Sequence, residues 1–208
     1  PARAAITEDG AVQDGFFEST TTVGGGAVLP LVKFRLKQTS GSDTLSQVGV
    51  QIIASTTMTA GEISRLSLWM ESGAQPGFQL GSDTFVAGAA SSSPSVNGVL
   101  NLLTPTSAVS IGSAGSEFYI IASTTAITGI TNGDAFNVYL QANYASTTGG
   151  SGIGAAFGSG KKVSLNQSAT LKISEVKAGN TGNTSDEFIE LYNSGESDIN
   201  LQDLPLQV

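Results

Sequence analysis

Short runs of apolar and β-branched residues recur every ten to twenty residues along this chain, separated by turn-forming residues. The clearest runs cover residues 28–37, 45–54, 63–70 and 135–144. No window of eleven or more residues carries an uninterrupted apolar stripe at helical spacing. Many short strands at this spacing are typical of a β-sandwich or barrel rather than of a parallel α/β sheet. We therefore predict an all-β fold built as a sandwich.

The alternation within these runs predicts which side chains face the core. Between residues 31 and 37, Val32, Phe34 and Leu36 share one face of the expected strand, and the other face is mostly basic. Successive side chains of a strand point to opposite faces, so this pattern predicts one buried face. The inward-facing residues predicted for the last run are Phe136, Val138, Leu140 and Ala142.

A short repeat follows three of the apolar runs. Ile-Ile-Ala-Ser-Thr-Thr occurs at residues 52–57 and again at 120–125, and Ala-Ser-Thr-Thr occurs at 145–148. We interpret the repeat as a turn that ends a strand, in which Ser and Thr hydroxyls bond to nearby backbone. A glycosylated or ligand-binding threonine ladder is the alternative interpretation.

Composition shifts divide the chain into four parts. Residues 1–27 are irregular and are expected to form an extended N-terminal arm, and residues 28–148 hold the strands of the sandwich. Residues 149–160 consist almost entirely of Gly, Ser and Ala, which is typical of a flexible linker. Residues 161–208 form a separate C-terminal β segment. Because the chain begins at Pro1, we expect a processed or trimmed chain.

The charge balance excludes several partners. The chain has nine basic and seventeen acidic residues, which gives a net charge of −8. Nucleic-acid binding needs clustered Lys and Arg, so we expect no nucleic-acid partner. No apolar run reaches the length of a membrane helix, so we expect no membrane span. Charged residues make up only 12% of the chain, and Gly, Ser, Thr and Ala take their place. This composition favours an extracellular or cell-surface protein.

The residues needed for common catalytic sites are missing. The chain has no Cys and no His, and no G-x-S-x-G motif, so a serine or thiol nucleophile would have no activating base. The acidic residues Asp186, Glu187 and Glu190 cluster on one expected strand, and Asp186 and Glu190 share a face of it, but nothing in the sequence marks a cleft around them. A hydrolase is therefore the third interpretation, and we expect no enzyme activity.

Calcium is the one cofactor that the sequence leaves open, because it takes carboxylate and carbonyl oxygens. Asp14, Asp83 and Asp134 lie in expected loops and are the weak candidates for ligands. No calcium-loop signature occurs around them, and loop carboxylates in water are the simpler interpretation. Trp69 is the only tryptophan, and we expect it in the core or an interface.

The C-terminal segment has a more specific pattern. Residues 171–177, 186–193 and 199–206 read as three short strands joined by polar turns. The pattern resembles the opening of a lamin-tail domain, an immunoglobulin-like sandwich, and covers about a third of such a domain. The resemblance implies an interaction module rather than an enzyme.

A second, looser resemblance covers residues 28–146. The residues that carry it are 33–37, 44–50, 63–68 and 133–138, which resemble a bacterial surface immunoglobulin-like module. The resemblance implies a sandwich of immunoglobulin-like or jelly-roll type, here with extended N- and C-terminal segments.

Tails that look incomplete as independent folds predict self-assembly. Strand edges left without a partner are templates for pairing with another chain. We therefore predict a structural subunit of an extracellular filament, tube or surface layer that polymerises with copies of itself by strand addition. An immunoglobulin-like module that binds or adheres to glycan or protein is the alternative. The predicted polymerisation residues are Ile6, Val12, Phe16, Phe17, Val23, Ile173, Phe188, Ile189, Leu191 and Leu201.

Overall fold

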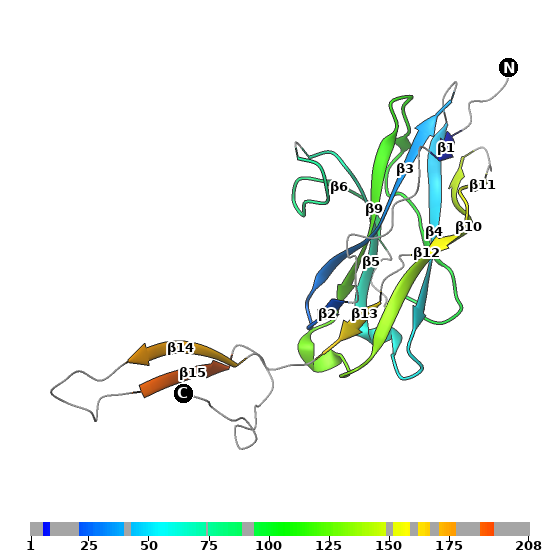
Figure 1. Ribbon diagram of the computed structural model, residues 1–208. Helices are drawn as coiled ribbons and strands as arrows, with labels where there is room; N and C mark the ends of the chain where they lie inside the picture. The colour runs from blue at the N-terminus through cyan, green and yellow to red at the C-terminus, as the bar shows by residue number, and fades with distance from the viewer. Residues whose placement is uncertain are drawn as a thin grey trace. The chain divides into compact units, whose positions relative to one another are not determined.

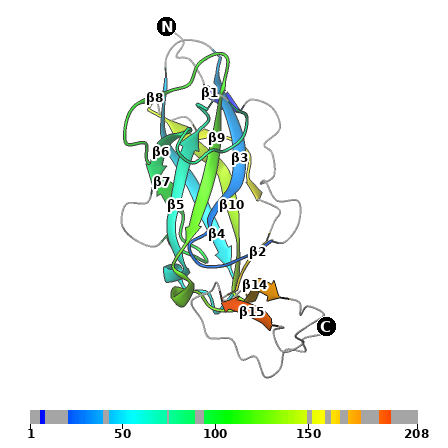
Figure 2. The ribbon, with the colours of Figure 1, turned by 90° about the vertical axis from the view of Figure 1, so that its left-hand side faces the viewer.

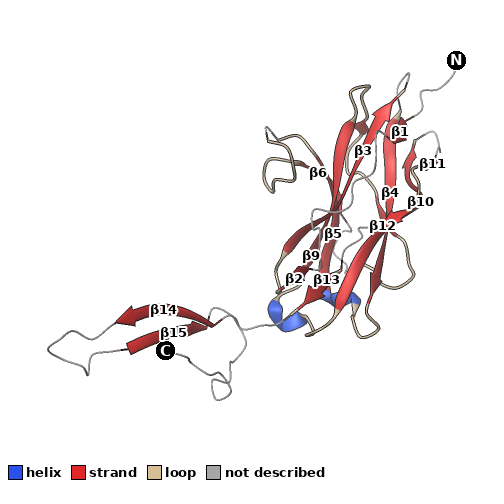
Figure 3. Cartoon of the chain, viewed as in Figure 1, coloured by secondary structure: helices blue, strands red, loops and turns tan. Residues whose placement is uncertain are grey.

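The computed structural model describes most of the chain, and its strands fall into two compact units. The first unit covers residues 1–166 and the second covers residues 167–208. The prediction of an all-β sandwich is confirmed (Figure 3). The described residues are 6–8, 21–39, 43–73, 75–88, 94–148, 152–158, 162–166, 171–177 and 188–193.

The first unit contains two facing sheets (Figure 1). The five-stranded sheet has the order β1-β3-β9-β5-β6. Its strands are β1 (Ile6–Glu8), β3 (Val28–Gln38), β9 (Ser116–Thr124), β5 (Ile63–Met70) and β6 (Thr84–Gly88). We call it the first sheet.

The second sheet has the order β2-β13-β10-β4-β7, and three short strands pair alongside this path. The main strands are β2 (Thr21–Val23), β13 (Val163–Leu165), β10 (Ala135–Thr147), β4 (Thr44–Ala54) and β7 (Asn101–Leu103). The short ones are β8 (Val109–Ser110), which pairs with β4, and β11 (Gly152–Ile153) and β12 (Phe157–Gly158), which pair with β10. Figure 2 shows β7 and β8 near the same border of the unit.

Most strand pairs in the two sheets are antiparallel and join segments far apart in the chain, as in the pairs β3–β9 and β4–β10. The N-terminal segment contributes to both sheets, because β1 pairs antiparallel with β3 whereas β2 pairs parallel with β13.

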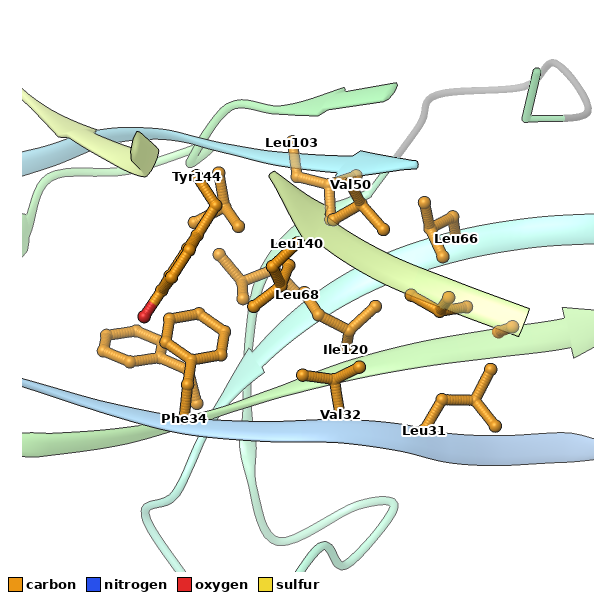
Figure 4. Close-up of a cluster of buried hydrophobic side chains, with 14 of the residues drawn as sticks. Leu31, Val32, Phe34, Val50, Leu66, Leu68, Leu103, Ile120, Leu140 and Tyr144 are labelled. Atoms are coloured by element: carbon orange, nitrogen blue, oxygen red, sulfur yellow. The ribbon is translucent and has the colours of Figure 1, made fainter. Parts of the chain in front are cut away.

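The core fills the space between the two sheets (Figure 4). Phe34 lies against Phe118 with ring centroids 5.4 Å apart and meets the edge of Tyr144 at 5.2 Å. Val32 and Ile120 of the first sheet are fully buried, as the alternation of their strands requires. The predicted inward residues Val32, Phe34, Leu36, Phe136, Val138 and Leu140 are all confirmed.

β-Bulges change the alternation at two places in the core. In β3, Pro30 pairs with Ile121 and Val32 pairs with Ile120, so Leu31 is an extra residue and is buried beside Val32. In β10, the register shifts between Leu140 and Ala145. The prediction that Ala142 faces the core is therefore wrong, and Tyr144 takes the inward position instead.

The domain boundaries differ from those expected. Residues 149–160 were predicted to be a linker, but the described strands β11 and β12 within this range pair with β10. The sandwich thus extends to residue 166, because β13 also belongs to its second sheet. The N-terminal arm predicted for residues 1–27 likewise supplies β1 and β2 to the sandwich.

The described helical segments are two single turns, η1 (Ala60–Glu62) and η2 (Ile127–Gly129), shown in blue in Figure 3. Over the described residues, no helix has the length and apolar character needed to cross a membrane.

The second unit contains an antiparallel pair of strands, β14 (Leu171–Lys177) and β15 (Phe188–Asn193). We call this pair the C-terminal ribbon. Two paired strands in isolation are marginally stable in water, because they cannot bury an apolar face by themselves.

Candidate interaction surfaces

The predicted N-terminal polymerisation residues take part in the chain's own sandwich where they are described. Ile6 is 3% exposed and belongs to the core, and its strand pairs with residues 36–38 of β3. Val23 packs against the core from β2. The structure therefore gives these two residues an intramolecular role. Val12, Phe16, Phe17 and Leu201 lie outside the described residues.

The C-terminal ribbon has one apolar face. Val176 pairs with Ile189, and Ile173 pairs with Leu191, so the members of each pair point to the same side. Ile173 and Val176 are three residues apart and would point to opposite sides of a regular strand. A bulge at Ser174 places Ile173 and Val176 on the same face, because Ile173 pairs with Leu191 while Glu175 pairs with Glu190, the next residue back along β15. Ile173, Val176 and Ile189 are 60%, 62% and 41% exposed.

The opposite face of the ribbon is mixed. Glu175 lies directly across from Glu190, which places two like charges side by side. The next pair on this face joins Lys177 to Phe188, and the ammonium lies 6.0 Å from the ring centroid. Phe188, one of the predicted polymerisation residues, is thus separated from the apolar face that carries Ile173, Ile189 and Leu191.

A second exposed apolar surface lies on the outer face of the second sheet, at its edge strand β7. Leu102 pairs with Gly49 of β4 and is 52% exposed. Leu100 lies over the same glycine, since a Cβ built on Gly49 would meet its side chain at 3.0 Å. Ile53 is outward-facing on β4, and Val99 is 61% exposed. We call these four residues, Ile53, Val99, Leu100 and Leu102, the β7 patch.

The described strands of the second sheet carry no charged residue. None occurs in residues 44–61, 84–116 or 135–160, and the described strands β2 and β13 also have none. Native proteins commonly protect an edge strand with lysine, proline or a bulge. β7 carries an exposed leucine and no charge, so it lacks the usual charged protection. The first sheet differs, because Lys33, Arg35 and Glu117 lie on its outer face.

A shallow pocket of about 250 Å³ lies next to the β7 patch. Ile53, Phe136 and Lys162 are among the residues that line it. Lys162 is exposed and places a positive charge at the margin of the uncharged sheet.

The calcium candidate Asp83 binds backbone N–H groups of the loop between β5 and β6. Its carboxylate accepts backbone N–H bonds from Ser72 and Gly73, both at 3.1 Å, and from Gln79 at 2.7 Å. Burial raises the pKa of Asp83, but hydrogen bonds from the three backbone N–H groups stabilise the carboxylate. Their effect is larger than that of burial, so the pKa of Asp83 lies below its ordinary value. These bonds hold residues 72–83 together between β5 and β6.

The calcium candidate Asp134 has a separate position at the start of β10. It is 2% exposed, and its Oδ1 accepts hydrogen bonds from the hydroxyls of Ser55 at 3.0 Å and of Thr57. Among the described residues, no group of three or more acidic side chains has metal-binding geometry. Asp14 lies outside the described residues.

The bonds of Asp134 also explain the sequence repeat. Ser55 and Thr57 belong to its first copy. Both hydroxyls donate to the Asp134 carboxylate, and the Ser55 hydroxyl also accepts from the backbone N–H of Ala135 at 3.1 Å. In the second copy, Thr124 accepts from the Ala27 N–H at 2.8 Å and donates to the Gly24 carbonyl at 3.0 Å. The repeat thus ends strands by hydroxyl bonds in both copies, with different partners.

Trp69 lies outside the main core in a small aromatic cluster on the first sheet. Its ring meets the edges of Phe78 and Phe85 at centroid distances of 5.5 and 5.4 Å. Phe78 in turn contacts Tyr119 at 5.9 Å. Burial, together with hydrogen bonds to Glu117 and Glu71, raises the pKa of the Tyr119 hydroxyl. The cluster packs Phe78, from the loop after β5, against the sheet.

Comparison with known protein families finds no match for this chain. A search of curated proteins also finds no relative. The two exposed apolar surfaces are therefore the features that bear on function, and the sequence indicated only the C-terminal one.

Proposed function

We propose that this chain is a structural subunit of an extracellular assembly, a filament, tube or surface layer, in which copies join through their β-structure. The observation that carries the proposal is the C-terminal ribbon, whose apolar face is exposed in the chain's own fold. A two-stranded ribbon needs a further layer or strand for stability. A neighbouring copy would supply that layer.

The second support is the unprotected edge of the second sheet. An exposed, apolar, uncharged edge strand pairs readily with another chain. Addition of β-structure from one subunit to an edge of the next is a known mode of assembly, and backbone hydrogen bonds supply much of its affinity. The low content of charged residues, 12%, favours the extracellular location.

The test compares the full chain with a form truncated after residue 166. We expect the full chain to form concentration-dependent oligomers in sedimentation velocity and fibres or sheets in negative-stain micrographs. The truncated form should remain a folded monomer, because its sandwich keeps both sheets. Truncation of residues 1–27 is a poorer test, since it removes β1 and β2 from the sandwich.

A full chain that stays monomeric at every concentration would contradict the proposal. It would favour the second candidate, an immunoglobulin-like module that binds glycan or protein. One observation supports that candidate: the loop held by Asp83 presents Leu80, which is 64% exposed, beside the Trp69 cluster. Glycan-array or pull-down binding by the monomer, lost in Leu80→Ser, would then identify it.

A further inference from the structure

Most of the exposed large apolar side chains lie on two surfaces. Among the described residues, these side chains belong to the β7 patch or to the C-terminal ribbon, apart from Val28 and Leu80. Scattered exposed leucines need no explanation, but contiguous apolar surface marks a site of interaction. The two surfaces belong to different units. One lies at the edge strand β7, and the other is a face of a two-stranded ribbon, so each can be extended by further β-structure.

Electrostatics favours a second copy of this chain as the partner of the β7 patch. Two copies each carry a net charge of −8, so their contact is opposed by repulsion unless it uses surfaces without charge. The second sheet is such a surface, because its described strands carry no charged residue. The apolar face of the ribbon, with Ile173, Val176 and Ile189, is another.

Charge at the margins also fits this pairing. The second unit contains seven acidic and two basic residues, so it carries five of the eight net negative charges. Lys162 is exposed beside Ile53, at the margin of the uncharged sheet. A ribbon that covers Ile53 and its neighbours would bring acidic residues close to this cation.

We propose, building on the assembly function above, that the apolar face of the C-terminal ribbon of one copy docks on the β7 patch of another copy. Ile173, Val176, Ile189 and Leu191 then cover Ile53, Val99, Leu100 and Leu102. Because the two surfaces differ, a pair of joined subunits keeps one unused ribbon and one unused β7 patch. Such a head-to-tail contact adds subunits without closing, unless the rotation between them forms a ring.

Single lysine substitutions test each surface with a matched control. Leu102→Lys changes the β7 patch, and Leu80→Lys makes the same change at an exposed residue of the loop between β5 and β6. Ile189→Lys changes the apolar face of the ribbon, and Phe188→Lys changes its neighbour on the opposite face. Leu102→Lys and Ile189→Lys should raise the critical concentration for assembly by at least about tenfold. The two controls should stay within about twofold of the unchanged chain.

Mixing the two defective variants gives the sharper result. The Leu102→Lys chain keeps an intact ribbon, and the Ile189→Lys chain keeps an intact β7 patch. Each variant alone should be monomeric, and an equimolar mixture should form dimers that do not grow further. Sedimentation velocity measures both states, and circular dichroism with a thermal melt shows that each variant is folded.

Several outcomes would overturn the docking proposal and leave the assembly function intact. Normal fibres from Leu102→Lys or Ile189→Lys would show that the surface in question is not used. A mixture that stays monomeric would show that the ribbon of one copy does not dock on the β7 patch of another. An equal loss in the control variants would also overturn it. A monomeric unchanged chain would instead refute the assembly function.

Discussion

At the scale of single residues, buried carboxylates hold the loops of this sandwich in place. Asp83 gathers three backbone N–H groups between β5 and β6, and Asp134 binds two hydroxyls where β4 ends. Hydrogen bonds to a charged acceptor are stronger than neutral ones, and burial makes their loss costly. The loops of a chain without disulfides depend on such bonds.

Asp83→Asn should destabilise the first unit by about 1–3 kcal/mol at neutral pH, because the amide cannot accept all three backbone bonds. The folded pKa of Asp83 lies below its unfolded value, so its contribution is complete above the unfolded pKa, about 3.9. That contribution is lost as the pH falls through the folded pKa. Urea unfolding at several pH values measures both effects.

The control for this prediction is the pH profile of the substituted protein. Asp83→Asn should remove part of the loss of stability that the unchanged chain shows below about pH 4. Identical pH profiles for the two proteins would contradict an ionised, hydrogen-bonded Asp83.

Phe34→Ala tests the core at the contact between the sheets. Phe34 is 1% exposed and touches the rings of Phe118 and Tyr144, so truncation leaves a cavity that neither sheet can close fully. We expect a loss of about 3–5 kcal/mol in the free energy of unfolding, measured in urea. Phe34→Leu, which keeps most of the volume, is the control. A loss under about 1 kcal/mol for Phe34→Ala would contradict the packing.

At the scale of elements, bulges decide which residues a strand presents. Ser174 keeps Ile173 and Val176 on one face of the ribbon, and Leu31 adds a buried residue to β3. In β10 the register shift turns Tyr144 toward Phe34. Asn143 has φ 59°, a left-handed conformation that asparagine tolerates better than most residues. Each bulge changes the alternation without changing the order of the strands.

The cross-strand pair Glu175 and Glu190 gives a prediction at this scale. Like charges directly opposite each other destabilise a ribbon, so Glu175→Lys should stabilise it by about 0.2–1 kcal/mol by creating an opposite-charge pair. Slower hydrogen exchange of the amides of β14 and β15 would measure the gain. Glu175→Gln should give a smaller gain. Faster exchange in Glu175→Lys would contradict the register.

At the scale of the whole molecule, charge is distributed unevenly. One sheet has no charged residue in its described strands, whereas the second unit carries most of the net negative charge. Self-association of an acidic chain is easiest where its charge is lowest. The uneven distribution therefore favours the second sheet as the surface for the proposed contact between copies.

Lys162→Glu tests this view of assembly. Reversal of the charge at the margin of the uncharged sheet should raise the critical concentration several-fold, because an acidic ribbon would then meet an anion. The neutral control Lys162→Met should have a smaller effect. The difference between the two variants should shrink at about 1 M salt, where charges are screened within about 3 Å. A difference that is independent of salt would contradict an electrostatic role.

The alternation of apolar residues predicted the all-β class and most of the core, including Val32, Phe34 and Val138. It did so because strand periodicity is local and needs no knowledge of the partner strand. The sequence also shows that residues 84–116 carry no charge, but it does not show which surface of the fold this uncharged stretch forms. The apolar residues of the C-terminal strands could also be predicted, because strand periodicity is local there too.

Tertiary structure decided the rest. Only pairing shows that residues 152–153, 157–158 and 163–165 belong to the sandwich, that Ile6 is a core residue, and that Tyr144 rather than Ala142 faces inward. Only pairing brings Leu102 beside Gly49 and places Ile53 on the same face, so the sequence alone does not show that these residues share one exposed surface. Register and bulges depend on contacts between residues far apart in the chain, and local pattern does not encode them.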